Sequence, residues 1–167
     1  IGGSRMESNG LSSLFPLEKM SVMGFVEVLK HLIFFKHVEK KVLETISIEK
    51  PERIILIDYP GFNLRLAEKA KHKFNIPITY YISPQIWAWK EKRINIIREY
   101  IDQMLVIFPF EKKWYAERGV DVEWVGHPYL ENWKPTAKSE LKAQLGLIPD
   151  KPLLTLFPGS RKQELDN

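Results

Sequence analysis

Asp58 is the residue best placed for acid–base chemistry. It follows four apolar residues at 54–57 and comes just before Pro60 and Gly61, which break the strand that the apolar run predicts. A run without polar alternation is typical of a strand buried on both faces of a parallel sheet. We therefore expect a carboxylate at the carboxyl end of a central strand, where open α/β sheets bind ligands. Capping of the following helix by Asp58 or Asn63 is the alternative.

A second candidate site is a turn near the end of the chain. Gly159, Ser160 and Arg161 follow a predicted strand at 153–157 and precede the start of a predicted helix. A glycine lets the backbone approach a ligand, amides at a helix start favour phosphate, and a guanidinium holds phosphate through two hydrogen bonds. An ordinary capped turn is the more common explanation of such a short pattern.

The loop that follows the predicted strand at 78–82 carries Trp87 and Trp89 on either side of an alanine. Aromatic faces pack on sugar rings or apolar chains, although paired tryptophans also serve as loop anchors. His127 lies in a Gly-His-Pro turn and is able to bind a ligand or move a proton. A structural hydrogen bond from a turn histidine is the alternative.

Composition narrows the classes of function. The 167 residues carry a net charge of +4 and contain no cysteine, so a thiolate metal site and a disulfide framework are excluded. No set of His, Asp and Glu residues has metal-ligand spacing, and neither a Gly-x-Ser-x-Gly elbow nor a Walker loop is present. No metal or other cofactor is predicted. The charge bias favours anionic partners such as phosphates, but it is too weak to predict nucleic-acid binding.

Strand and helix patterns alternate along the chain. Helices are expected at 6–10, 62–73, 90–100, 110–118 and 139–145, and strands at 54–58, 78–82, 104–108, 122–125 and 153–157. This order predicts an α/β fold with a Rossmann-like parallel sheet flanked by helices. We expect residues 1–128 to form a partial domain, 129–152 a linker region, and 153–167 the start of a second domain. The absence of an initial methionine suggests a piece of a larger protein.

Residues 22–35 form an apolar segment with basic neighbours. A helix over these residues has more apolar positions than one core stripe needs. We expect it to lie on an anionic membrane surface, which binds such segments by apolar area and charge together. The membrane-contacting residues would be Val26, Val28, Leu29, Leu32 and Phe35. A core helix packed on all sides is the alternative.

Seven segments stand in a characteristic order and spacing. They are Gly-Gly-Ser-Arg-Met at 2–6, residues 21–29, Ile-Asp-Tyr-Pro-Gly-Phe-Asn at 57–63, Tyr-Ile-Ser-Pro-Gln-Ile-Trp-Ala-Trp at 81–89, Phe-Pro-Phe-Glu-Lys at 108–112, Val-Gly-His-Pro at 125–128, and Leu-Phe-Pro-Gly-Ser-Arg at 156–161. Together they resemble the lipid A disaccharide synthase family of inverting glycosyltransferases. The resemblance covers essentially the whole chain. It departs from the family pattern at Gly61, where the family usually has a second aspartate.

The resemblance implies the N-terminal half of a two-domain GT-B fold, with residues 153–167 beginning the nucleotide-sugar-binding domain. The implied reaction joins UDP-2,3-diacylglucosamine to 2,3-diacylglucosamine 1-phosphate (lipid X) and releases UDP. An inverting transfer needs a base beside the acceptor hydroxyl and stabilisation of the leaving diphosphate. Asp58 matches the first role, and Ser160 with Arg161 the second. Asn63, Ser83, Trp87, Trp89 and His127 are candidates for the acceptor site or the cleft.

The resemblance also implies a cytoplasmic enzyme that is peripheral on the inner membrane, with no nucleic-acid partner. The fragment by itself is expected to be inactive. Two alternatives remain open: another GT-B sugar-nucleotide enzyme, or a non-catalytic α/β module that binds a nucleotide or a lipid.

Overall fold

The structure is a computed structural model that describes residues 1–16, 27–131 and 133–157, with the side chains of residues 27–32 outside the description. The chain divides into two compact units, Ile1–Pro128 and Tyr129–Asn167. Each unit is described by itself. In the described part of the chain, no helix is long and apolar enough to cross a bilayer.

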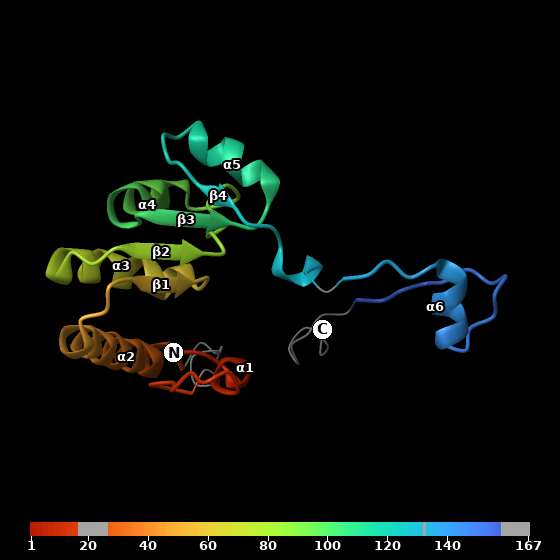
Figure 1. Ribbon diagram of the computed structural model, residues 1–167, viewed down its shortest axis with the longest axis horizontal. Coiled ribbons are helices and arrows are strands. Elements are labelled where there is room, and N and C mark those ends of the chain that lie inside the picture. Colours follow the sequence, from red (N-terminus) through yellow and green to blue (C-terminus); the bar gives the residue numbers. More distant parts are fainter. Residues whose placement is uncertain (17–26, 132, 158–167) are drawn as a thin grey trace. The chain divides into compact units, whose positions relative to one another are not determined.

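A four-stranded parallel sheet forms the centre of the first unit (Figure 1). Its strands are β1 (Ile54–Ile57), β2 (Ile78–Tyr81), β3 (Gln103–Val106) and β4 (Glu123–Trp124), and they lie side by side in sequence order. Ile54 pairs with Ile78, and Thr79 pairs with Gln103. Each crossover contains a helix, as parallel pairing requires. The predicted α/β fold with a parallel sheet flanked by helices is therefore confirmed.

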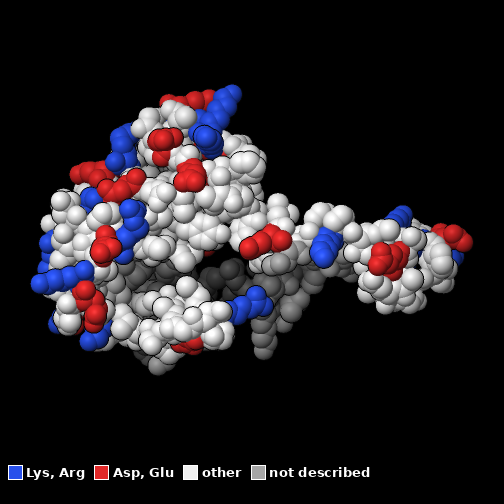
Figure 2. Space-filling model, viewed as in Figure 1, with Lys and Arg blue, Asp and Glu red and all other residues white. Residues whose placement is uncertain are grey.

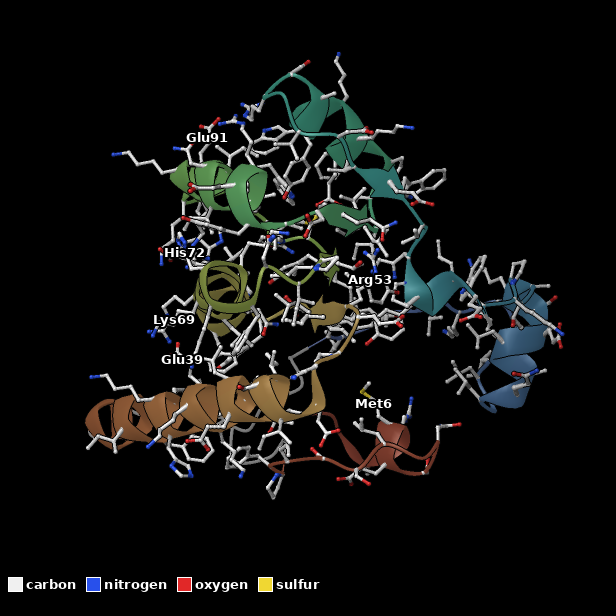
Figure 3. The ribbon with its side chains drawn as sticks, turned by 60° about the vertical axis from the view of Figure 1, so that its left-hand side comes forward. Met6, Glu39, Arg53, Lys69, His72 and Glu91 are labelled. Atoms are coloured by element: carbon white, nitrogen blue, oxygen red, sulfur yellow. The ribbon has the colours of Figure 1, made fainter. Side chains whose placement is uncertain are left out.

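Helices connect and cover these strands. α2 (Glu27–Glu49) precedes β1, α3 (Pro60–Phe74) links β1 to β2, α4 (Ile94–Tyr100) links β2 to β3 after a short 3₁₀ turn at Glu91–Arg93, and α5 (Pro109–Ala116) links β3 to β4. Figure 3 shows α2, α3 and α4 stacked on one side of the strands. The core lies between the sheet and these helices. Its buried members include Leu56, Tyr80, Met104, Ala67, Ala70, Ile97 and Tyr115.

The position of β1 corrects one expectation. β1 lies at an edge of the described sheet instead of its centre, and it is not buried on both faces. Leu56 is buried, whereas Ile55 and Ile57 are 64% and 42% exposed. The reason is that alternate residues of a strand point to opposite faces, and the helical layer covers only the face of Leu56. In β1, a run of apolar residues therefore does not mean that both faces of the strand are covered.

The part of α2 from Phe35 onward contributes to the core. Phe35, Val38, Val42 and Ile46 recur at helical spacing and pack against the hydrophobic cluster. Glu39 is mostly buried, and its carboxylate accepts a hydrogen bond from Lys69 of α3. Figure 3 labels both residues of this pair between the two helices. The charge-rich part of α2 after residue 35 therefore packs on the core and binds α3 through the Glu39–Lys69 pair.

Two predicted elements near the ends have other bounds. The first helix, α1, spans Ser4–Glu7 and not 6–10. A 3₁₀ turn at Pro128–Leu130 crosses the point in the sequence where the second unit begins. In the second unit, helix α6 spans Lys138–Gln144, and its N-cap is Ala137, not Ser139. Gly146, with φ of 65°, follows its end. No side chain makes a capping hydrogen bond at the start of either helix, so the polar residues nearby do not mark where these helices begin.

The strand predicted at 153–157 is not present. These residues belong to no helix or strand, and Leu154, Leu156 and Phe157 are all strongly exposed. A strand exists only where a neighbouring strand supplies hydrogen-bond partners, and no described residue pairs with this segment. The segment therefore has the apolar composition of a strand, but no strand of the described residues pairs with it.

Candidate functional site

The carboxyl ends of the four strands bring most of the candidate residues to one edge of the sheet. The ladder continues beyond the strands, because the Asp58 amide donates to the Tyr81 carbonyl (2.9 Å) and the Ile82 amide donates to the Leu105 carbonyl (3.1 Å). At the next pair the Val125 amide donates to the Val106 carbonyl (3.0 Å). Asp58, Ser83 and His127, which follow β1, β2 and β4, therefore lie at the same edge of the sheet, as expected for a ligand-binding edge.

The backbone of Asp58 has an uncommon conformation. Asp58 and Tyr59 both have left-handed φ values, 47° and 48°, immediately before helix α3. Such residues persist where surrounding contacts hold them, and they are frequent at functional sites. The Asp58 carbonyl accepts two hydrogen bonds, from the Tyr80 hydroxyl (2.5 Å) and from the Asn63 side-chain amide (2.7 Å). These bonds fix the turn that presents Asp58.

The capping alternative is wrong for both residues. Tyr59 is the N-cap of α3, and no side chain caps that helix. Asn63 instead donates backward, to the carbonyls of Ile57 and Asp58. Asp58 is exposed, and its carboxylate makes no hydrogen bond or ion pair with the described residues. The carboxylate is thus available to a substrate.

Tyr80 was missed by the sequence reasoning. Its side chain is fully buried under the turn, and burial raises the pKa of its hydroxyl well above the ordinary range, with the nearby Asp58 charge as the second cause. The hydroxyl therefore stays protonated and keeps donating to the Asp58 carbonyl. In the sequence, only its place in a predicted strand marks Tyr80, and a tyrosine there is ordinarily a core residue.

Ser83 belongs to a buried network at the same edge. Its hydroxyl donates to Oε1 of Glu111, and Oε2 of Glu111 accepts a hydrogen bond from the Phe108 amide (2.9 Å). Glu111 is only 1% exposed and lies in the first turn of α5. Sequence reasoning did not single it out, although a glutamate three residues after a helix start is the usual signal of a capping box.

Aromatic side chains line this edge next to the network. Trp87 packs edge-on against Phe110, with ring centroids 5.1 Å apart, and Phe110 stacks on Phe108 at 5.7 Å. Phe108 in turn lies 5.6 Å from His127. Trp89 stands apart from this row, with Nζ of Lys90 4.4 Å above its ring. The structure therefore brings Trp87 and His127 onto one aromatic row and leaves Trp89 outside it.

The remaining candidates are described only in part. Val26, Ser160 and Arg161 lie outside the described residues, and Val28, Leu29 and Leu32 lie in α2 with their side chains outside the description. Phe35 is half-buried against Tyr59 and Phe62, with ring centroids 6.0 and 5.9 Å away. Its neighbour Ile33 is 73% exposed. Phe35 therefore faces the core at least in part.

The charges near the site are mixed. On the face shown in Figure 2, basic and acidic side chains of the first unit alternate, and no large field of one sign is present in this view. Within residues 1–16, 27–131 and 133–157, no group of three or more His, Asp or Glu residues is placed to hold a metal ion. The described chemistry of the edge is one open carboxylate, one buried carboxylate and an aromatic row.

The whole chain is similar to known proteins of one family. A family model described as lipid-A-disaccharide synthetase matches residues 1–167. Lipid-A-disaccharide synthase 1 of Legionella pneumophila (strain Philadelphia 1) is 44% identical over 167 residues, which is 99% of this chain and 44% of that relative. Lipid-A-disaccharide synthase of Coxiella burnetii (strain Dugway) is 41% identical with the same coverage. That of Myxococcus xanthus is 41% identical over 166 residues, 99% of this chain and 43% of the relative.

Proposed function

Because the chain belongs to the lipid-A-disaccharide synthetase family, we propose that the intact protein joins UDP-2,3-diacylglucosamine to lipid X and releases UDP. The product is the tetraacyl disaccharide 1-phosphate of lipid A biosynthesis. The chain spans about 44% of the length of the curated relatives it matches. The activity is therefore proposed for the intact protein and not for residues 1–167 alone.

Asp58 is the proposed general base, and its geometry is the observation that carries the proposal. Its carboxylate is open at the ligand-binding edge while its backbone is fixed by Tyr80 and Asn63. In an inverting transfer the base takes the proton of the acceptor hydroxyl as that oxygen attacks the anomeric carbon, and UDP leaves from the opposite side. A base on a fixed backbone loses little freedom when the acceptor binds.

The leaving diphosphate is assigned to Ser160 and Arg161, on the family resemblance. Together with Gly159 they would supply a hydroxyl, a guanidinium and a close backbone approach at the beginning of the nucleotide-sugar domain at 153–167. Charge-assisted hydrogen bonds of this kind stabilise an oxyanion as it develops. Residues 1–128 would belong to the acceptor-side domain, and residues 129–152 would link it in sequence to the nucleotide-sugar domain.

The acceptor is proposed to bind along the sheet edge between Asp58 and His127. Trp87 and His127 contribute aromatic surface to the row at the same sheet edge as the base. Trp89 and Ser83 belong to the same loop as Trp87, where Trp89 is exposed and Ser83 is buried. Asn63 acts on the acceptor indirectly in this arrangement, because its amide is occupied by the carbonyls that hold Asp58 in place.

The test is a UDP-release assay on the intact protein, with and without lipid X. Asp58→Ala should lower the rate by about 10²–10⁴-fold, the usual contribution of a general base. Its thermal stability should stay near that of the wild type, because the carboxylate has no partner among the described residues. Asp121→Ala, which removes an exposed carboxylate just before β4, is the matched control and should keep full activity.

The same assay separates the alternatives. UDP release that does not depend on lipid X would favour another sugar-nucleotide enzyme. Binding of nucleotide or lipid without any release of UDP would favour a non-catalytic module. Full activity of Asp58→Ala would contradict its role as the base.

A further inference from the structure

One buried carboxylate joins the loops that follow two neighbouring strands. Glu111 uses both oxygens: Oε2 accepts from the Phe108 amide just after β3, and Oε1 accepts from the Ser83 hydroxyl just after β2. Ser83 lies 28 residues earlier in the chain. An ordinary capping glutamate needs only the first of these bonds. The second bond therefore calls for an explanation beyond the start of α5.

Burying a carboxylate is costly unless its oxygens are satisfied. Glu111 and Ser83 are 1% and 5% exposed, and no buried side-chain polar atom in the described residues lacks a hydrogen-bond partner. The first turn of α5 also places the charge near the positive end of the helix dipole. The link between the two loops is thus fully desolvated and fully satisfied, which makes it rigid.

The 83–89 loop, which begins at Ser83, presents two tryptophans. Ser83, Pro84 and Ile86 point inward and are buried, whereas Trp87 and Trp89 are exposed. Tyr115, one turn after Glu111 on α5, donates to the Pro84 carbonyl at 3.5 Å. Phe110, the residue before Glu111, packs against the Trp87 ring. Helix α5 therefore contacts this loop at its start, Ser83 and Pro84, and at the exposed ring of Trp87.

We propose that Glu111 is a positioning residue that fixes the 83–89 loop and thereby orients Trp87 for the acceptor. This inference rests on the proposed function, in which the aromatic row at the sheet edge of Asp58 receives lipid X. Glu111 itself touches no substrate, because it is buried below the loop. It acts through Ser83 and through the packing of Phe110 on Trp87.

Three variants of the intact protein separate positioning from simple stability. Ser83→Ala removes the bond to the loop and leaves the bond to the Phe108 amide. Glu111→Ala removes both. Glu111→Gln keeps both contacts but reverses one of them: its oxygen accepts from the Phe108 amide, while its NH₂ donates to the Ser83 hydroxyl, whose own proton then turns to another acceptor. Glu117→Ala, on an exposed carboxylate just after α5, is the matched control.

The readouts are the KM values for lipid X and for the UDP-sugar, and hydrogen exchange of the loop amides. Loss of a hydrogen bond to a charged group should raise the KM for lipid X about ten- to a hundredfold in Ser83→Ala and Glu111→Ala. The KM for the UDP-sugar should stay near the wild-type value. The amides of Ile86 and Ala88, which close turns onto Pro84 and Gln85, should exchange faster. Glu111→Gln and Glu117→Ala should behave like the wild type.

The double variant adds a further check. Because Ser83 and Glu111 act through one bond, Ser83→Ala should add little to Glu111→Ala in the KM for lipid X. Unchanged loop exchange in Ser83→Ala, or an equal rise of both KM values, would overturn the proposal. If Glu111→Ala does not fold, the KM for lipid X and the loop exchange of Ser83→Ala and Glu111→Gln still test the proposal. Failure of the proposed function itself would instead appear as an Asp58→Ala variant with full activity.

Discussion

At the scale of single residues, the backbone of Asp58 is held by partners that sequence inspection does not reveal. The Tyr80 hydroxyl reaches the Asp58 carbonyl from the next strand, 22 residues later in the chain. The Asn63 amide reaches the same carbonyl from the first turn of α3. Both bonds oppose relaxation of a left-handed residue pair, whose strain is of the order of 1–3 kcal/mol per residue.

Tyr80→Phe tests this account. The substitution keeps the buried ring and removes one hydrogen bond, so the free energy of unfolding should fall by about 1 kcal/mol. If the turn orients the base, the UDP-release rate should fall as well, by more than that of Tyr100→Phe, a change on the half-buried ring at the end of α4. Stability is measured by urea denaturation. A rate equal to that of the wild type would show that Asp58 does not depend on this bond.

At the scale of elements, Asp102 connects α3 to the start of β2 and β3. Its carboxylate accepts from Nζ of Lys71 at 2.8 Å and from the Ile78 amide at 2.7 Å. Partial burial acts to raise the pKa of Asp102, but the hydrogen bonds from Lys71 and from the Ile78 amide outweigh it and lower the pKa below its ordinary value. The folded state therefore binds this proton less readily than the unfolded state does.

This lowered pKa predicts a pH dependence. The stabilisation from Asp102 should be fully present above its unfolded pKa of about 3.9, and it should be lost as the pH falls through the lower folded value. Asp102→Asn keeps an acceptor for the Ile78 amide and removes the charge. Its difference in unfolding free energy from the wild type should therefore shrink as the pH is lowered below about 4.

Urea denaturation between acidic and neutral pH measures this difference. The control is Glu52→Gln, an exposed carboxylate two residues before β1, which should show no comparable trend. A difference that stays constant with pH would mean that the Lys71–Asp102 pair contributes nothing measurable, as is common for exposed ion pairs.

At the scale of the whole molecule, we propose that the role of α2 is divided along its length. Residues from Phe35 onward pack against the core, and Ile46 is only 7% exposed. The apolar residues before Phe35 remain the proposed membrane contact, with Val26, Val28, Leu29 and Leu32 as its members. Phe35 is better kept out of a test of membrane binding, because its ring contacts Tyr59 and Phe62.

Serine at Val26, Val28, Leu29 and Leu32 should give an intact protein that folds but no longer sediments with anionic vesicles, because it loses apolar contact area. Ile46→Ala on the same helix is the contrast. It should lower the free energy of unfolding by about 2–5 kcal/mol and leave vesicle binding unchanged. Unfolding of the fourfold variant would favour a core helix, and undiminished sedimentation would place the membrane contact elsewhere.

The amino-acid sequence by itself determined the alternation of strands and helices. Apolar runs, helical spacing and breakers such as Pro60 and Pro109 are local, and they predicted β1 to β4 and the helices between them within a few residues. They also placed Asp58, Ser83 and His127 after the first, second and fourth strands. Because parallel strands end at one edge, the grouping of these residues followed from the order of elements alone.

Only the tertiary structure decided which strand is at the edge, which apolar runs find partners, and which buried groups support the site. The exposure of Ile55 and the missing strand at 153–157 depend on pairing and covering by distant segments, which local composition does not encode. The bond from Ser83 to Glu111 joins residues 28 positions apart. A hydrogen bond of this kind depends on how α5 packs against the sheet, so it becomes visible only once the chain is folded.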